Sequence, residues 1–507
     1  MFDLGRTLLA AAERDPMAEA VVDGERRLSY AELLQSVRRV MGALEKLGLR
    51  PGEHLVMLLQ NRVEMVILHW ACQMLGVVST PVNWRVKAEE LDYYLDDAEA
   101  QAVVFQDASA AAVAKSARAR AIARIAVDDA SHATCRFDEL LKAAPAEGAP
   151  RASAEDVSLM FYTSGTTGRP KGVPRRHRAE RAAAFAHVAQ NCYAYGERTL
   201  GVMPLYHTMG VRSLLSMALI NGCFVCLGRF EAGRALELIE REKTTNLYLV
   251  PTLYHDLLAH PAFHRANLTS VRKLGFAGAP MSEGLLRRVA QAFRPDLFVN
   301  HYGSSEVYTF TINQNAAAKP GSAGKAGINT RIRVVKLNST DSADLAPVGR
   351  DGHIIAILEG DESFEGYWKR PDADAKTLHQ GWYFTGDVGH FDAEGDLFVT
   401  GRADDMIISG GENVHPGEIE DVLSLCHGVA EVVVAGVSDE RLGQRITAFV
   451  KRRGEIDAAA LDAYCRASSL ADFKRPREYV FVAEIPKSPT GKVLRRMLVV
   501  GEFKPEK

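Results

Sequence analysis

The sequence predicts an α/β protein whose larger part is doubly wound, and two observations lead to this class. Helical and strand periods alternate along roughly the first four hundred residues. The chain has 507 residues, 47% hydrophobic and 25% charged, so it can bury sizeable cores and is not disordered. In doubly wound folds, ligands bind beyond the carboxyl ends of the strands. The functional loops are therefore expected to follow apolar strands.

The elements of this alternating part are predicted in turn. Residues 1–14 place charges among apolar residues at helical spacing, which predicts a helix and not a signal peptide. The Ala-rich residues 108–124 are expected to form an exposed helix. Three units of a helix followed by a buried strand are expected at 63–75 with 77–81, 235–243 with 246–250, and 285–293 with 296–299.

Two smaller sections follow. Residues from about 320 to 400 predict a small β-rich section with strands at 331–337 and 353–358. The last hundred residues predict a compact α+β unit, which is long enough to fold as its own domain. We therefore expect a large domain over residues 1–402 and a small one over 403–507. The small domain is expected to contain helices at 416–425 and 458–467 and strands at 431–435, 446–451 and 478–482.

Composition excludes several classes of partner. The 61 basic and 64 acidic side chains leave a formal charge of −3, so nucleic acid or an anionic membrane surface is not expected to bind. The most apolar stretch, residues 213–227, is short and predicts a helix, a turn and a strand rather than a membrane span. An odd number of cysteines, seven, favours a reducing cytoplasm. Cys223 and Cys226 are expected in a buried strand and not at a metal.

The most informative local pattern is a loop rich in glycine and hydroxyl residues, Phe161-Tyr-Thr-Ser-Gly-Thr-Thr-Gly-Arg-Pro-Lys-Gly172. Glycines allow close backbone approach, and amides and hydroxyls bond phosphate oxygens, so this composition is typical of a phosphate-binding loop. Taken alone, it is also typical of a plain surface turn. Pro170 stands where the P-loop NTPase motif requires glycine, which disfavours a Walker-type NTPase.

With this loop the chain resembles the acyl-adenylate-forming superfamily, which comprises acyl-CoA and aryl-CoA synthetases, carrier-protein adenylation domains and beetle luciferases. Five motifs in the family's order are a specific pattern, and residues 402–420 and 470–476 are most similar to bacterial chlorobenzoate-type aryl-CoA ligases. The four motifs that follow the loop are His301-Tyr-Gly-Ser-Ser-Glu306, Gly381-Trp-Tyr-Phe-Thr-Gly-Asp-Val-Gly389, Gly401-Arg-Ala-Asp-Asp-Met-Ile-Ile-Ser-Gly-Gly-Glu-Asn413 and Pro486-Lys-Ser-Pro-Thr-Gly-Lys492.

The resemblance implies an AMP-forming ligase that uses ATP, Mg²⁺ and coenzyme A (CoA). A carboxylate attacks the α-phosphorus of ATP, pyrophosphate leaves, and the CoA thiol then displaces AMP from the mixed anhydride. Because an anionic nucleophile meets an anionic triphosphate, we expect catalysis mainly by positioning and charge neutralisation.

The resemblance also assigns residues to the nucleotide. Glu306 is the expected Mg²⁺ ligand, helped by the hydroxyl of Thr166. Asp387 is expected to accept the ribose hydroxyls, and Arg402 to reach the ribose or the α-phosphate. Tyr302 is expected against the adenine, with plain core packing as the alternative. The expected ATP and AMP site comprises Thr163, Ser164, Gly165, Thr166, Thr167, Gly168, Lys171, Ala279, Tyr302, Gly303, Ser305, Asp387 and Arg402.

The small domain is expected to move. By resemblance, Lys492 enters the active site for adenylation only, and the domain then rotates about a hinge at Asp404. After rotation, Ser409, Gly410 and Gly411 would face the acyl site, although a tight turn would also require such glycines. Leu442 stands where close relatives carry a Trp that stacks on the CoA adenine. The expected CoA contacts are these three turn residues with Arg85, Phe473, Lys474 and Arg475.

The acyl pocket is expected to be largely apolar, without an obvious cation at its base, which favours an aromatic or alicyclic monocarboxylate. His207 could gate the carboxylate or the thiol tunnel, or could be structural. Tyr308 and His301 could supply one polar contact to a ring substituent. The expected lining is Phe185, His207, Met209, Val250, Ala279, His301, Gly303, Val307 and Tyr308.

Other functions stay open at this point. The acid could be a medium-chain fatty acid, or the acyl group could pass to a carrier-protein thiol, although Arg85 and the basic residues beside Phe473 favour free CoA. A luciferase-type oxidation and a non-catalytic nucleotide-binding protein are further alternatives. The four charged motif residues argue against the last of these. We expect a cytoplasmic monomer or homodimer.

Overall fold

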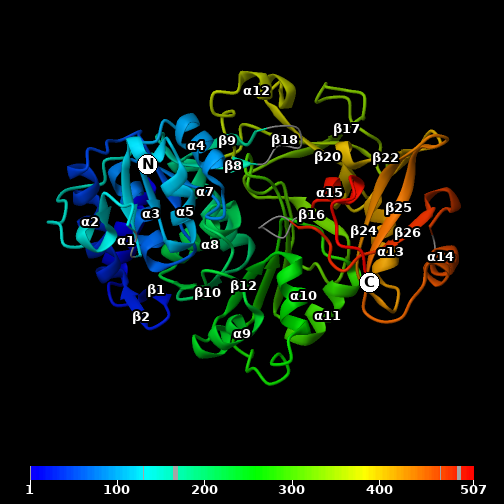
Figure 1. The fold of residues 1–507 in the computed structure, drawn as a ribbon, viewed down its shortest axis with the longest axis horizontal. Coiled ribbons are helices and arrows are strands. Elements are labelled where there is room, and N and C mark those ends of the chain that lie inside the picture. Colours follow the sequence, from blue (N-terminus) through cyan, green and yellow to red (C-terminus); the bar gives the residue numbers. More distant parts are fainter. Residues whose placement is uncertain (1, 129–130, 164–168, 469, 488–492, 507) are drawn as a thin grey trace.

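The computed structural model describes residues 2–506 except 129–130, 164–168, 469 and 488–492, and it describes Asp404 and Asn413 by their backbone alone. Two large sheets with their helices precede a third, smaller sheet (Figure 1). The predicted class, a large doubly wound α/β domain with a β-rich section and a small α+β domain, is confirmed.

The first large sheet has the strand order β7-β6-β5-β3-β4-β8-β9. Its neighbours are parallel except for the β8–β9 hairpin, whose connection carries the Gly-rich loop. The strands are β3 (His54–Leu58), β4 (Val78–Pro81), β5 (Ala102–Phe105), β6 (Ala123–Ala126), β7 (Cys135–Arg136), β8 (Val157–Thr163) and β9 (Lys171–Arg176).

The second large sheet begins with a parallel part, in the order β14-β13-β12-β10-β11-β1, with β2 antiparallel at its edge. All seven cysteines are free, and the predicted burial of Cys223 and Cys226 in a strand is confirmed. The strands are β1 (Glu19–Asp23), β2 (Arg26–Ser29), β10 (Arg198–Gly201), β11 (Cys223–Cys226), β12 (Asn246–Leu249), β13 (Lys273–Phe276) and β14 (Leu297–Tyr302).

An antiparallel extension continues this sheet beyond β14, in the order β15-β16-β21-β20-β18-β17, with β19 paired to β20. It corresponds to the β-rich section expected from about residue 320. The strands are β15 (Thr311–Asn313), β16 (Ser322–Ala326), β17 (Ile332–Val335), β18 (Gly352–Ile357), β19 (Leu378–His379), β20 (Trp382–Phe391) and β21 (Leu397–Arg402), with helix α12 (Pro371–Thr377) beside them.

Helices cover the large sheets in layers. One group packs between the two sheets in a shared core: α1 (Leu4–Arg14), α2 (Tyr30–Lys46), α3 (Val63–Leu75), α7 (His177–Gln190) and α8 (Thr208–Leu219). The outer face of the first sheet packs against α4 (Ala88–Asp97) and α5 (Asp107–Lys115). The outer face of the second packs against α9 (Ala232–Arg241), α10 (Pro251–Ala259) and α11 (Glu283–Phe293). The short α6 (Phe137–Leu140) follows β7.

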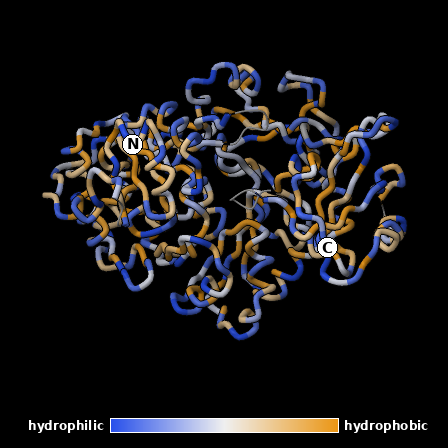
Figure 2. The backbone as a smooth tube through the Cα atoms, in the orientation of Figure 1, coloured by the Kyte–Doolittle hydropathy of each residue, from blue (hydrophilic) through white to orange (hydrophobic). Residues whose placement is uncertain are grey.

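The sequence of α3 explains its place in the middle layer. All its residues from Val63 to Leu75 are buried, as expected for a helix in which only Glu64, His69 and Gln73 are polar or charged. It ends at Gly76, whose φ of +80° is a left-handed conformation that glycine adopts without strain. Figure 2 shows the same pattern along the backbone, with hydrophobic segments concentrated in the strands and the helices between them. No helix of the described residues is long and apolar enough to cross a membrane.

The third sheet has the order β23-β22-β25-β24, with β26 added beside β25. Its strands are β22 (Ile407–Ser409), β23 (Glu412–Val414), β24 (Val429–Asp439), β25 (Gly443–Arg452) and β26 (Glu478–Phe481). Its helices are α13 (Pro416–Ser424), α14 (Ala458–Ala467) and α15 (Arg495–Val499). The described residues contain three short 3₁₀ turns: η1 (Ala119–Ala121), η2 (Ala403–Asp405) and η3 (Asp472–Lys474).

One predicted helix is wrong in extent. The Ala-rich segment 108–124 forms a helix only to Lys115, followed by η1 and the start of β6. The carboxylate of Asp92 on α4 accepts from the Ser116 hydroxyl and from the Arg118 amide, at 3.0 Å for the amide. This tertiary contact replaces the next helical hydrogen bonds, so the helix ends there.

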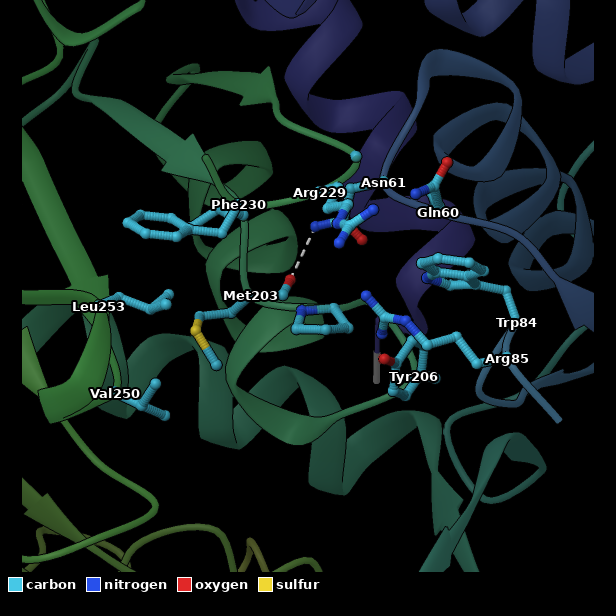
Figure 3. Close-up of a pocket in the computed structure, with 13 residues that line it drawn as sticks. Gln60, Asn61, Trp84, Arg85, Met203, Tyr206, Arg229, Phe230, Val250 and Leu253 are labelled. Carbon is cyan, nitrogen blue, oxygen red and sulfur yellow. Dashed lines mark hydrogen bonds between the residues drawn. The ribbon is translucent and has the colours of Figure 1, made fainter. Parts of the chain in front are cut away.

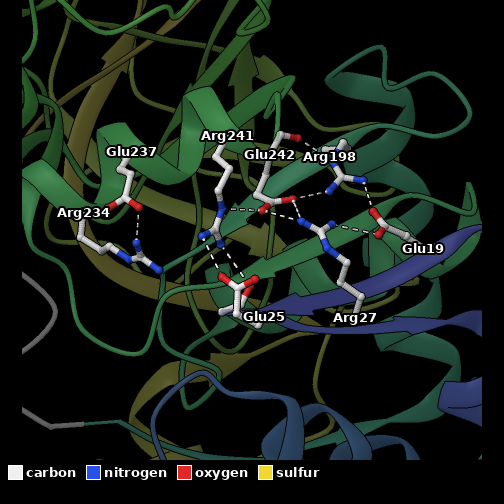
Figure 4. Close-up of polar contacts among 9 residues, drawn as sticks. Glu19, Glu25, Arg27, Arg198, Arg234, Glu237, Arg241 and Glu242 are labelled. Carbon is white, nitrogen blue, oxygen red and sulfur yellow. Dashed lines mark hydrogen bonds and ion pairs between the residues drawn. The ribbon is translucent and has the colours of Figure 1, made fainter.

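An ion-pair network joins the β1–β2 hairpin, at the edge of the second sheet, to β10 and α9 (Figure 4). The side chain of Glu242 is 2% exposed and accepts from Arg27 at 2.8 Å, from Arg241 at 2.9 Å and from Arg198 at 3.1 Å. Arg198 also pairs with Glu19 at 2.8 Å. The network therefore fastens β1–β2 to β10 and to the end of α9.

Candidate active site

The Gly-rich loop connects β8 to β9, and its two ends are cross-strand neighbours. Thr163 faces Lys171 in the hairpin register. The Nζ atom of Lys171 lies 3.9 Å from the centre of the Tyr367 ring. Burial lowers the pKa of Lys171, and the carboxylate of Glu306 opposes that shift. Five predicted loop residues lie outside the described part: Ser164, Gly165, Thr166, Thr167 and Gly168.

Glu306 is a buried carboxylate in the loop after β14, with 6% of its surface exposed. Its Oε1 accepts a hydrogen bond of 2.7 Å from the Tyr367 hydroxyl. Its backbone carbonyl accepts from Arg175 at 2.9 Å. Among the described residues, no basic nitrogen lies within 4.0 Å of this carboxylate, so its charge is left for a cation or a polar ligand.

The loop that holds Glu306 folds back tightly on β14. The amide of Phe310 donates to the Tyr302 carbonyl at 2.8 Å, and the amide of Ser304 donates to the Val307 carbonyl at 3.0 Å. A Cβ atom at Gly303 would lie 1.9 Å from the Tyr308 carbonyl oxygen, so only glycine fits. Ser305 is half-buried in the same loop.

Asp387 and Arg402 are neighbours across β20 and β21. Arg402 Nη1 donates to Asp387 Oδ1 at 3.0 Å, and the Tyr302 hydroxyl donates to Asp387 Oδ2 at 2.5 Å. Burial and this carboxylate raise the pKa of Tyr302 well above its usual value. The charge of Arg402 also acts on Lys171. Asp387, Arg402 and Tyr302 therefore lie in the same region as Glu306, because Arg402 and the Glu306 carboxylate both act on the pKa of Lys171.

An apolar cluster follows the ends of β12 and β13. Met209 and Val250 are buried and pack with Met203, Tyr248 and Ala277. A Cβ atom at Gly278, next to the half-buried Ala279, would lie 3.4 Å from Val250. His207 caps the N-terminus of α8, and burial lowers its pKa to about 4, so the imidazole is neutral near pH 7.

His301 lies beside this cluster at the end of β14. Its ring centre is 5.2 Å from that of Tyr248 and 5.2 Å from that of His187. Its Nε2 is 3.1 Å from the side-chain nitrogen of Asn191, and its Nδ1 is buried without a hydrogen-bond partner among the described residues. The predicted polar contact is therefore available at this end of the cluster.

Three predicted lining residues are placed differently from what we expected. Phe185 is 46% exposed, and its ring contacts the guanidinium of Arg181. Val307 is fully buried in the core that joins β9 to the β-rich section. Tyr308 donates its hydroxyl to Glu180 at 2.8 Å, so that oxygen already has a partner.

A buried polar group that was not predicted from the sequence lies behind Tyr308. The guanidinium carbon of Arg175 lies 4.1 Å from the Tyr308 ring centre, and that of Arg212 lies 4.8 Å from it. Arg175 pairs with Glu180 at 2.8 Å, with both side chains fully buried. Two arginines therefore lie beside Tyr308, one of the residues expected to line an acyl pocket without an obvious cation at its base. A lone arginine within the apolar helix α8 was the available indication.

A cavity of about 140 Å³ opens between the two large sheets (Figure 3). At one side Trp84, Arg85 and Arg229 line it, and the guanidinium carbon of Arg85 lies 3.9 Å from the Trp84 ring centre. The opposite side is apolar. It is formed by Met203, Phe230, Val250 and Leu253. Because Val250 belongs to both, the cavity adjoins the apolar cluster described above.

The remaining predicted CoA contacts lie in the small domain. Phe473 is 44% exposed, whereas Lys474 pairs with Glu418 and Arg475 pairs with Asp462 at 3.3 Å. These residues belong to the segment between α14 and β26, which in Figure 1 lies well away from α4, the helix that follows Arg85 in the chain. The two predicted parts of the CoA site are therefore apart in this structure.

The turn between β22 and β23 is exposed. Gly410 has φ +61° and Gly411 has φ +87°, the combination that a two-residue hairpin turn requires, and Ser409 ends β22. Asp404 lies in η2, between the last strand of the second sheet and the first strand of the third. Lys492 lies outside the described residues.

Comparisons with known proteins agree with this arrangement. The model of the AMP-binding enzyme family matches residues 8–368, and that of the AMP-binding enzyme C-terminal domain matches residues 418–492. A 4-chlorobenzoate–CoA ligase of Pseudomonas sp. (strain CBS-3) is 36% identical over 509 residues, which cover 97% of this chain and 93% of the relative. The long-chain-fatty-acid–CoA ligase FadD13 of Mycobacterium tuberculosis (strain ATCC 25618 / H37Rv) is 31% identical over 504 residues, 98% of each chain.

Solved structures give the same result. The o-succinylbenzoate–CoA synthetase MenE of Bacillus subtilis, in complex with its acyl-adenylate intermediate, superposes with a TM-score of 0.83 at 27% identity and covers 97% of each chain. The resemblance drawn from the five motifs is thereby confirmed. The chain belongs to the AMP-binding enzyme family, as an AMP-forming acid–CoA ligase with ATP and CoA as its substrates.

Proposed function

We propose that this ligase activates an aromatic or alicyclic monocarboxylic acid. The observation that supports this class is the apolar cluster around Met209, Val250 and Ala277, which follows the neutral imidazole of His207 in the chain. A compact ring would bury its surface against these side chains. The chlorobenzoate ligase similarity points the same way. A medium-chain fatty acid is the second candidate, since the relative FadD13 acts on long-chain fatty acids.

In the first half-reaction, a carboxylate oxygen of the acid bonds to the α-phosphorus of ATP, and the bond from that phosphorus to the β-phosphate oxygen breaks. Lys171 and Arg402 would lower the charge repulsion between the two anions. Asp387 would hold the ribose hydroxyls, with Tyr302 and Arg402 fixing its orientation. The CoA sulfur then bonds to the acyl carbon, AMP leaves, and the thiol proton is released.

Mg²⁺ fits the residues near Glu306. The carboxylate is buried, one oxygen accepts from Tyr367, and no described cationic side chain lies within ion-pair distance. Mg²⁺ prefers one or two carboxylates together with phosphate oxygens and water. Glu306, with the hydroxyl of Thr166, would hold the ion, which would supply charge neutralisation at the phosphates.

We further propose that the small domain alternates between two positions about Asp404. The exposure of the Gly410–Gly411 turn and the separation of Arg85 from Phe473 support it, because thioester formation would require these parts to meet. Lys492 would serve adenylation only. Lys492→Ala is therefore expected to reduce pyrophosphate release at least 100-fold and to change thioester formation from preformed acyl-AMP less than about threefold. Equal losses in both half-reactions would contradict this role.

The thiol acceptor is free CoA rather than a carrier protein. Arg85 and Arg229 at the cavity mouth could neutralise CoA phosphates, and Trp84 offers an aromatic face that Leu442 cannot. We also propose a cytoplasmic enzyme, in keeping with its seven free thiols, acting as a monomer or homodimer.

A pyrophosphate-release screen tests the substrate class. Benzoates and cyclohexane carboxylates are expected to give higher kcat/KM than C4 to C12 fatty acids, because their rings match a short apolar cluster. A panel in which fatty acids of increasing length gave increasing kcat/KM would favour the second candidate. A panel in which only short dicarboxylates reacted would overturn both.

A further inference from the structure

A buried arginine that has no counter-ion among the described residues lies beside the proposed acyl site. Arg212 is 3% exposed and lies on α8, one helical turn beyond Met209. Its guanidinium lies over the ring of Tyr308, and its Nε is buried without a hydrogen-bond partner. No carboxylate oxygen of the described residues lies within 4.0 Å of it. A buried charge is costly unless it is paired, so Arg212 lacks the partner that such a position requires.

The groups that surround Arg212 do not supply that partner. Tyr248 contacts the guanidinium through its hydroxyl. Glu362 is 1% exposed; burial raises the pKa of its carboxyl, and the charge of Arg212 opposes that shift. Burial, with a smaller effect of Arg212, lowers the pKa values of His187 and His301 well below their usual value. None of these described groups forms an ion pair with Arg212 within 4.0 Å.

Several acceptors and donors there are also left unpaired. Besides Arg212 Nε, buried atoms without hydrogen-bond partners among the described residues include His301 Nδ1, His187 Nε2 and Glu362 Oε2. Buried polar atoms of folded proteins are nearly always hydrogen-bonded, so this concentration indicates a place where a ligand or water completes the set. Tyr248 and His301 connect it to the apolar cluster, because Tyr248 packs with Met209 and Val250.

We propose that Arg212 is a specificity-determining residue, and that it binds an oxygen acceptor carried by the acid at the end remote from its reacting carboxylate. The proposal rests on the proposed function and narrows its substrate class. The oxygen can be a neutral carbonyl or the oxygen of a second carboxylate, since a guanidinium N–H donates to both. An acid that ends in hydrocarbon would bury Arg212 without an acceptor and is disfavoured for that reason.

Matched acids test this. 4-Acetylbenzoate is compared with 4-isopropylbenzoate, and 4-oxocyclohexane carboxylate with 4-methylcyclohexane carboxylate, by pyrophosphate release. The ketone of at least one pair is expected to have a kcat/KM about 10- to 100-fold higher than its hydrocarbon partner. Benzene-1,4-dicarboxylate is measured in the same assay, as the acid whose remote oxygen belongs to a second carboxylate. If this diacid alone has a raised kcat/KM, the remote oxygen belongs to a carboxylate. That result supports Arg212 as the specificity-determining residue and overturns the monocarboxylate class.

Variants separate recognition from structure. Arg212→Met keeps an unbranched side chain that reaches about as far as Nε but removes all the donors. It is expected to reduce the ratio of kcat/KM values between the oxygen-bearing acid and its hydrocarbon partner to about one, by lowering kcat/KM for the oxygen-bearing acid alone. Arg212→Lys, with its charge retained, is expected to keep part of the preference. The proposal is overturned if wild-type enzyme shows no preference for any oxygen-bearing acid, or if Arg212→Met lowers both members of a pair equally. The wild-type comparison decides even if a variant does not fold, and absence of turnover with every acid would instead contradict the proposed substrate class.

Discussion

Replacing Gly303 by alanine is expected to disable adenylation. Gly303 stands between Tyr302, which donates to Asp387, and the buried carboxylate of Glu306. A Cβ atom at this position would lie 1.9 Å from the Tyr308 carbonyl oxygen and 2.7 Å from its carbonyl carbon. Cβ atoms essentially never approach another heavy atom within 3.0 Å, so the loop must open by about 1.1 Å. Both atoms belong to the backbone, and no rotamer change relieves the clash.

The size of the effect follows from that displacement. A misplacement of about 1 Å can cost roughly 100-fold in rate, which corresponds to about 2.7 kcal/mol of transition-state stabilisation. We expect kcat/KM for acid-dependent pyrophosphate release to fall about 100-fold. The free energy of unfolding should fall by only about 1 to 3 kcal/mol, the usual cost of overpacking. Circular dichroism with urea titration measures the second quantity on the same sample.

Gly454 provides the matched control. A Cβ atom there would meet no heavy atom within 4 Å, and the residue follows β25 at the surface of the small domain. Gly454→Ala is expected to retain kcat/KM within about twofold of wild type. The reasoning is refuted if Gly303→Ala keeps more than about a third of wild-type activity, since the close approach would then not position the site.

Two further changes give sharp expectations. Asp387→Asn leaves one acceptor oxygen for two ribose hydroxyls, which costs about 1.5 to 3 kcal/mol, so the KM for ATP should rise about 10- to 100-fold in initial-rate measurements; an unchanged KM would contradict its ribose role. Lowering the pH from 6.5 towards 4 should destabilise the fold, because burial lowers the pKa of His54 and of His177 to about 4 and only the unfolded chain takes up these protons. Each group costs up to about 1.4 kcal/mol per pH unit in this window, and equal urea midpoints at pH 7 and pH 5 would contradict it.

The sequence predicts most of the fold, because its periodic patterns coincide with burial. Residues 63–75 were expected as a helix and form α3 with those bounds, since most of its side chains are apolar and the helix is buried between two sheets. The segment 108–124 was only partly predicted. Its helix stops at Lys115 because Asp92, distant in the sequence, accepts from the residues that follow. Local propensity carries no information about such a contact.

The candidate site was likewise predicted only in part. Asp387 and Arg402 were expected at one nucleotide, and the register of β20 and β21 places them opposite each other. The direction of a side chain was harder to predict. Phe185 and Val307 were assigned to the acyl pocket by position in a motif, and such a position does not tell which way a side chain points. Arg212 was passed over because a single charge in an apolar helix gives no indication of what it faces. Only the packing of α8 against Tyr308 reveals its neighbours.

The central claim is that one site first makes an acyl-adenylate and then a thioester. The most direct measurement mixes enzyme with ATP and a substrate acid in a single turnover without CoA, and follows pyrophosphate and nucleotide. The account predicts about one equivalent of pyrophosphate per enzyme and a bound acyl-AMP, with AMP and thioester released only after CoA is added. Formation of ADP and phosphate, or no pyrophosphate until CoA is present, would contradict it.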